Sequence, residues 1–101
     1  VVKAQTDDKQ TDQPVFKVQI LASSTKLPSN SPRFKKRDDV DCYEEGGMYK
    51  YTIGASTNYN EINRMRGTLA ETFPGAFVIA FRNGEKMNIT EAIRMFKNKR
   101  R

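Results

Sequence analysis

The alternation of apolar and polar side chains is clearest in residues 48–54, which are Met48-Tyr49-Lys50-Tyr51-Thr52-Ile53-Gly54. Successive side chains of a β-strand point to opposite faces, so this run predicts a half-buried strand that ends in a turn at its glycine. One face carries Tyr49, Tyr51 and Ile53, which is typical of a core. The other face carries Met48, Lys50 and Thr52, a mixture of pliable apolar group, cation and hydroxyl that is typical of a recognition surface.

The segments around this strand predict two hairpins and a first strand. Residues 40–45 lead into Gly46-Gly47, and paired glycines supply the positive φ angles of a tight turn, so residues 40–54 are expected to form a hairpin. Residues 76–81 are strongly apolar, and Asn83-Gly84 is a second turn that returns into residues 85–88. The first strand is expected over residues 16–22, where one face carries Phe16, Val18, Ile20 and Ala22 and the other carries Lys17, Gln19 and Leu21.

Helical signals occur between these strands. Ser31 followed by Pro32 predicts a short first helix, with Phe34 as its inward anchor. The main helix is expected to start at Asn58, with Glu61 in the position of a capping box, and to end at Pro74-Gly75. Its apolar residues recur at helical spacing, at Ile62, Met65, Leu69 and Phe73.

Two further observations concern helices. Gly67 costs about 1 kcal/mol relative to alanine inside a helix, which predicts close packing at that position. A last short amphipathic helix is expected where apolar residues recur at Ile89, Ala92, Ile93 and Phe96.

This order of elements predicts an α+β fold of the ferredoxin-like or RNP-like βαββαβ class, with an added C-terminal short helix. Helices cover one face of the antiparallel sheet in this class and leave the other face open. The first and third strands are expected in the middle, so Lys17, Gln19 and Leu21 would lie beside Met48, Lys50 and Thr52. On the last long strand we expect the bulky row Phe77, Ile79 and Phe81 to face the helices, which leaves Val78 and Ala80 on the open face.

The length of 101 residues and a hydrophobic content of 37% fit one small domain with tails. We expect a flexible linker over residues 1–13, a domain over residues 14–97 and a basic tail over residues 98–101. The polar linker suggests that another part of a longer protein precedes the domain. We expect no membrane span and a monomer.

The charge and the missing residue types limit the possible chemistry. A net charge of +6 favours an anionic partner, and three classes of partner fit: a nucleic acid, an anionic membrane surface or an acidic polymer. Histidine is absent, and with it the commonest metal ligand and general base. Cys42 is the only cysteine, so there is no internal disulfide and no thiolate metal cluster. We therefore predict no cofactor, no metal site and no catalytic residue, and we interpret the acidic residues 38–45 as solvated surface.

Four segments in this order resemble the SPOR (sporulation-related repeat) domain: Val18-Gln19-Ile20 with Ala22; Tyr49-Lys50-Tyr51-Thr52-Ile53-Gly54; a helix with Ile62, Arg64 and Leu69; and residues 76–84. The likeness covers about residues 14–96 and is greatest to SPOR modules at the C-terminus of N-acetylmuramoyl-L-alanine amidases of Bacteroides-like bacteria. It implies a non-catalytic module in the periplasm or cell envelope of a Gram-negative bacterium. Such modules bind peptidoglycan glycan strands that have lost their stem peptides and so target a zinc-dependent amidase, whose catalytic domain is absent here, to the division septum.

The resemblance also implies a set of binding residues on the open face. The family's glutamine of the first strand matches Gln19, and its small or hydroxyl residue three positions later falls on Ala22, next to Ser23. Its arginine four residues before the strand-ending glycine is matched by Lys50, which keeps the charge and loses the planar two-pronged donor. Its apolar positions fall on Met48 and Val78. The first helix is shorter than the family norm.

The chemistry of these side chains suits a sugar polymer. Sugar rings present apolar C–H faces and hydroxyl groups, so Met48, Leu21 and Val78 would contact the first and Gln19, Thr52 and Ser23 the second. Removal of the stem peptide leaves a free carboxylate on each muramic acid. Lys50 and Lys17 would pair with those carboxylates, which offers a physical reason for a preference for denuded strands.

Two other functions stay open. An RNA- or single-stranded-nucleic-acid-binding domain of the same fold class fits the positive charge, but it needs aromatic rings on the open face, and the aromatic residues here are expected on the buried one. A protein-interaction module without a small ligand would be favoured if Met48, Lys50 and Gln19 were buried.

Overall fold

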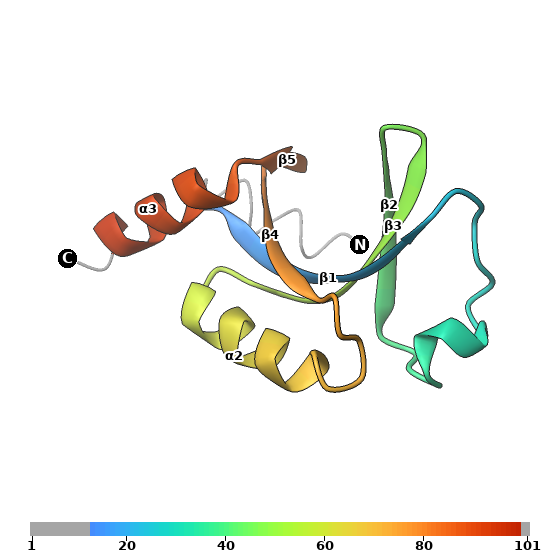
Figure 1. Cartoon of the computed structure of the whole chain (residues 1–101). Coiled ribbons are helices and arrows are strands. Elements are labelled where there is room, and N and C mark those ends of the chain that lie inside the picture. Colours follow the sequence, from blue (N-terminus) through green and yellow to red (C-terminus); the bar gives the residue numbers. More distant parts are fainter. Residues whose placement is uncertain (1–12, 100–101) are drawn as a thin grey trace.

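The computed structural model describes residues 13–99 and has the predicted α+β fold (Figure 1). An antiparallel sheet has the strand order β2-β3-β1-β4-β5. The strands are β1 (Val15–Ser23), β2 (Val40–Glu45), β3 (Met48–Ser56), β4 (Phe77–Arg82) and β5 (Glu85–Met87). The helices are the 3-10 turn η1 (Pro32–Phe34), α2 (Tyr59–Leu69) and α3 (Ile89–Lys99). The interior position of β1 and β3 is confirmed.

The sheet is curled, and its two sides differ in what covers them. In Figure 1, α2 lies below β1 and β4, while the β2–β3 hairpin and β5 rise on the opposite side of the curled sheet. We call the side toward which they rise the concave face. It is the helix-free face that the sequence predicts, and the strand registers decide which side chains belong to it.

The core lies on the other side, between the sheet and the helices. Tyr51 and Ile53 are buried there, and Tyr49 is half-buried against the same cluster, as predicted for this face of β3. Phe16 of β1 is completely buried and makes edge-on ring contacts with Tyr59 of α2 and Phe96 of α3, with ring centroids 5.3 and 6.1 Å apart. One aromatic side chain of β1 therefore packs against both helices.

The local signals for turns and caps are mostly confirmed. Asn83 and Gly84 have φ angles of 54° and 84°, as a tight hairpin turn requires. The Ser31 hydroxyl accepts a hydrogen bond from the Arg33 N–H at 3.2 Å, and Phe34 is buried. Asn58 caps α2 by accepting the Glu61 N–H at 3.2 Å, whereas the Glu61 carboxylate accepts from Ser56 and does not complete a capping box.

Three local expectations are wrong. β3 does not end at Gly54 but continues to Ser56, since Gly54, with φ of 83°, sits in a bulge where the register with β1 shifts. α2 ends at Leu69 and not at Pro74, since Ala70 is its C-cap and residues 70–73 form hydrogen-bonded turns that lead to the proline. Gly67 is exposed with no atom within 4 Å of the place of a Cβ, so close packing does not explain it.

The tails fall partly outside the described residues. Residues 1–12 of the expected linker and residues 100–101 of the expected basic tail lie outside them. α3 continues to Lys99, so the helix runs past the predicted domain boundary at residue 97.

The orientation of β4 is the opposite of the predicted one. Val78 lies opposite Val18 and Ala80 opposite Phe16, so this row faces the helices. Phe77, Ile79 and Phe81 lie opposite Gln19, Lys17 and Val15 and belong to the concave face. The reason is steric, because the space on the helix side is already filled by Phe16, and a small residue such as Ala80 must lie next to it.

Candidate functional site

Five of the predicted site residues share the concave face. Gln19 lies opposite both Thr52 of β3 and Phe77 of β4, and Lys17 lies opposite Ile79. Directly opposed residues of paired strands point to the same face of a sheet. By alternation along β3, Lys50 and Met48 share the face of Thr52. The structure therefore brings together Lys17, Gln19, Met48, Lys50 and Thr52.

Leu21, Ser23 and Val78 do not belong to this face, and their predicted place there is wrong. The register of β1 with β3 shifts between Gln19 and Leu21, which turns Leu21 toward Tyr51 and the core. The same shift places Ser23 opposite Tyr49 and puts Ala22, not Ser23, opposite Lys50. Val78 packs against the core because it pairs with Val18.

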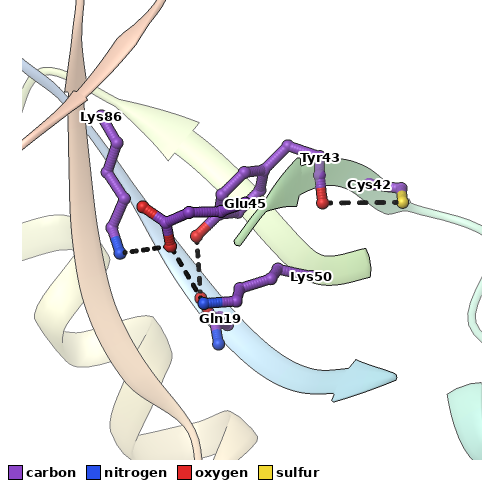
Figure 2. A network of polar contacts seen from close by, with 6 residues as sticks. All are labelled: Gln19, Cys42, Tyr43, Glu45, Lys50 and Lys86. Carbon is purple, nitrogen blue, oxygen red and sulfur yellow. Dashed lines mark hydrogen bonds and ion pairs between the residues drawn. The ribbon is translucent and has the colours of Figure 1, made fainter. Parts of the chain in front are cut away.

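The middle of the concave face is covered by a tyrosine from the edge strand β2. The Tyr43 hydroxyl donates a hydrogen bond to Gln19 Oε1 at 3.0 Å (Figure 2). Gln19 is only 6% exposed and Thr52 only 1%, so neither offers much surface to a ligand in this conformation. Burial raises the pKa of the Tyr43 hydroxyl above its ordinary value, and the nearby Glu45 carboxylate adds to the effect while Lys50 opposes it. Met48 and Lys50 are half-buried.

A charged cluster on the concave face connects the β2–β3 hairpin with the β4–β5 hairpin. Glu45 Oε1 accepts a hydrogen bond from Lys50 Nζ at 2.9 Å and another from Lys86 Nζ at 3.2 Å. Figure 2 shows the carboxylate between the two ammonium groups, one from β3 and one from β5. The hydrogen bond from Lys50, and then that from Lys86, holds the pKa of Glu45 below its ordinary value. We call Glu45, Lys50 and Lys86 the carboxylate clasp.

Aromatic side chains line the β4 side of the same face. The Tyr43 and Phe81 rings meet edge-on with centroids 5.1 Å apart, and Lys17 Nζ lies 5.1 Å from the centroid of Phe81. Ile79 beneath them is buried. Phe77 is 48% exposed and stands out as a large exposed hydrophobic residue among the described residues.

Sequence reasoning missed the clasp and the aromatic side chains, although the turns contain a signal for both. A two-residue turn at Gly46-Gly47 sets Glu45 opposite Met48 and Tyr43 opposite Lys50, which is the observed register. The turn at Asn83-Gly84 likewise sets Lys86 opposite Phe81. These pairings put the new residues on the face that carries Lys50.

A hollow lies on the other side of the sheet, beside η1. Its volume is about 460 Å³, and its lining includes Leu27, Phe34, Val40 and Tyr51. The Tyr51 hydroxyl accepts the Leu27 N–H at 2.7 Å, which ties the long connection to β3. Because η1 is only a single turn, the space beside it stays open. Arg37, one of its lining residues, forms an ion pair with Asp39 at 2.7 Å.

Within residues 13–99 no three Cys, Asp or Glu side chains are placed to hold a metal ion together. Over the same range no helix has the length and hydrophobicity needed to cross a membrane. Comparisons of the chain with protein-family models, with curated proteins and with solved structures find no significant match. The resemblance to SPOR domains therefore rests on the sequence segments alone.

Proposed function

We propose that the concave face binds the glycan strands of peptidoglycan, with a preference for strands that have lost their stem peptides. The observation that carries this proposal is the combination, on one helix-free face, of the half-buried Lys50 ammonium group with the exposed ring of Phe77. A carboxylated sugar polymer has the two complementary features, a negative charge on alternate sugars and flat apolar ring faces.

The apolar part of the site differs from the one expected from sequence. Phe77 takes the place assigned to Val78 and Leu21, and a phenyl ring suits a sugar face better than a branched aliphatic group because it is flat and rigid. Met48 is half-buried on the same face and adapts its shape readily to an irregular surface.

The charged part of the site provides the preference for denuded strands. Lys17, Lys50 and Lys86 stand on the concave face, whose β2 residues also include the carboxylates Asp41 and Glu45. A stem peptide converts the lactyl carboxylate of muramic acid into an amide, which removes the negative charge that a lysine recognises. Denuded strands would therefore bind more tightly, and the difference would shrink as salt screens the charges.

The resemblance to SPOR domains supports the biological setting of this proposal. In it the chain is a non-catalytic targeting module in the periplasm or cell envelope of a Gram-negative bacterium. It directs a zinc-dependent N-acetylmuramoyl-L-alanine amidase to the division septum, and hydrolysis belongs to a separate catalytic domain.

A pull-down tests the proposal. The purified chain is mixed with intact sacculi and with sacculi pretreated with an amidase, and the bound fraction is measured at low and high salt. Retention on the pretreated sacculi that weakens with salt supports the proposal. Equal or no retention on the two preparations argues against it.

A second candidate is binding of single-stranded nucleic acid, which the orientation of β4 favours. Phe77 and Phe81 lie on the helix-free face, contrary to the sequence expectation that counted against this function. The central strands, however, place Lys17, Gln19, Lys50 and Thr52 there, so the rings come from β4 and β2 and not from the middle of the sheet. A gel shift with single-stranded oligonucleotides, beside the sacculus pull-down, separates the two candidates.

A further inference from the structure

We infer that Lys50 and Lys86 together form a carboxylate-binding site, and that in the free chain this site is occupied by the chain's own Glu45. The carboxylate of an anionic ligand would then bind by replacing Glu45. This inference rests on the proposed function for the identity of the ligand, while the site itself is defined by the three side chains.

The geometry of the clasp is that of a carboxylate receptor. Two ammonium groups from β3 and β5 lie within hydrogen-bond distance of the same carboxylate oxygen, at 2.9 and 3.2 Å. Lys50 and Lys86 side chains are 22% and 32% exposed, so solvent and ligands reach them without unfolding. Ion pairs at this level of exposure contribute little to stability, because water screens the charges, so a ligand carboxylate can compete for them.

The position of Glu45 determines what changes on the concave face when a ligand carboxylate replaces it. Glu45 lies at the end of β2, next to Gly46-Gly47 in the turn of the hairpin, and its carboxylate contacts Lys86 of the opposite edge strand (Figure 2). Tyr43, two residues earlier on the same face, covers Gln19 by a hydrogen bond. When Glu45 leaves the two lysines, the cations become available and the contact that draws the β2–β3 hairpin toward β5 is lost.

The experiment compares Glu45→Gln with a matched control, Glu44→Gln. Both variants lose one negative charge, but Glu44 lies opposite Tyr49 and points away from the concave face. Equilibrium affinities are measured for three probes: denuded glycan strands, polygalacturonate as an unrelated carboxylated polysaccharide, and chitin oligosaccharides as a neutral N-acetylated glycan.

We expect Glu45→Gln to bind denuded strands and polygalacturonate about 3- to 10-fold more tightly than the parent chain, since an internal competitor is removed. Glu44→Gln should stay near the parent, and neither variant should gain affinity for chitin oligosaccharides. Lys86→Gln should bind both anionic polymers more weakly, which provides a second test through the opposite partner.

The outcomes separate this inference from the proposed function. If the parent binds denuded strands but Glu45→Gln gains no more than Glu44→Gln, the inference is overturned and the proposed function stands. If the parent does not bind denuded strands, the proposed function fails, and polygalacturonate still decides the inference. If Glu45→Gln but not Glu44→Gln binds polygalacturonate more tightly than the parent, the carboxylate site is supported. If Glu45→Gln shows no such increase in affinity, the site is refuted.

Discussion

Glu45 and Lys86 form an ion pair at 3.2 Å although they belong to β2 and β5, the two edge strands of the sheet. A flat sheet would keep these strands apart by the width of three others, at about 5 Å per strand. The contact therefore shows how strongly the sheet curls. The residues proposed to bind a ligand also share the concave face with a carboxylate of the chain itself, that of Glu45.

Replacement of Lys50 by alanine should weaken binding to denuded glycan by about tenfold, because a hydrogen bond to a charged group is lost from the middle of the site. The salt dependence of binding should also become shallower. Lys97→Ala is the control, since it removes the same charge from an exposed position of α3. Titrations at several salt concentrations measure both effects. Full, salt-sensitive binding by Lys50→Ala would contradict the role given to this residue.

Replacement of Phe77 by alanine should reduce glycan binding at least fivefold, about 1 kcal/mol, while it costs the fold about 1 kcal/mol or less, since the ring is half exposed. Val78→Ala is the neighbouring control. It faces the core and should lower thermal stability without changing the affinity of the folded protein. If Val78→Ala lost glycan binding while Phe77→Ala kept it, the ligand would lie on the other face of the sheet.

Two glycine substitutions should change stability in opposite directions. A Cβ on Gly54 would lie 2.6 Å from Met65 Sδ, and its φ of 83° is unfavourable for alanine, so Gly54→Ala should destabilise by about 1–2 kcal/mol or more. Gly67 lies inside α2 with open space around it, so Gly67→Ala should stabilise by about 0.5–1 kcal/mol. Denaturant unfolding of both variants measures the pair. A stable Gly54→Ala variant would be inconsistent with the bulge described for β3.

The clasp should weaken in acid. The groups that face Glu45 are the Lys50 and Lys86 ammonium groups, which lower its pKa, and the Tyr43 hydroxyl. Folding lowers the pKa of the Glu45 carboxyl group, so the ionised group stabilises the folded state at pH values above its ordinary pKa of 4.5. This contribution to stability is lost as the pH falls through the lowered pKa. Carbon NMR of the Glu45 carboxyl group should show that pKa, and Lys50→Ala should raise it toward 4.5. A Glu45 pKa at or above the ordinary value in the parent chain would mean that the clasp is absent in solution.

Much of the fold follows from local sequence signals, because these signals are properties of single turns and strands. The alternation in residues 48–54 gave the core face of β3 correctly, and Gly46-Gly47, Asn83-Gly84, Ser31 and Asn58 marked turns and caps that the structure contains. Strand alternation, tight turns and helix caps depend on residues that are close in the sequence, so they can be predicted from it.

The candidate site was less predictable, because its members depend on registers between strands distant in sequence. A bulge in β1 after Gln19 moved Leu21 and Ser23 off the concave face, and periodicity alone does not reveal a bulge. The bulk of Phe77 and Phe81 suggested burial, whereas pairing with Phe16 and Val18 reserves the helix side for Ala80 and Val78. The curl that joins Glu45 to Lys86 is a property of the whole sheet.

The decisive measurement is the affinity of the chain for glycan strands of matched length with and without their stem peptides, at low and high salt. We expect tighter binding to the denuded strands, a difference in affinity that narrows as salt increases, and loss of that difference in Lys50→Ala. Equal affinity for both kinds of strand, or tighter binding to single-stranded RNA than to either, would contradict the proposed function.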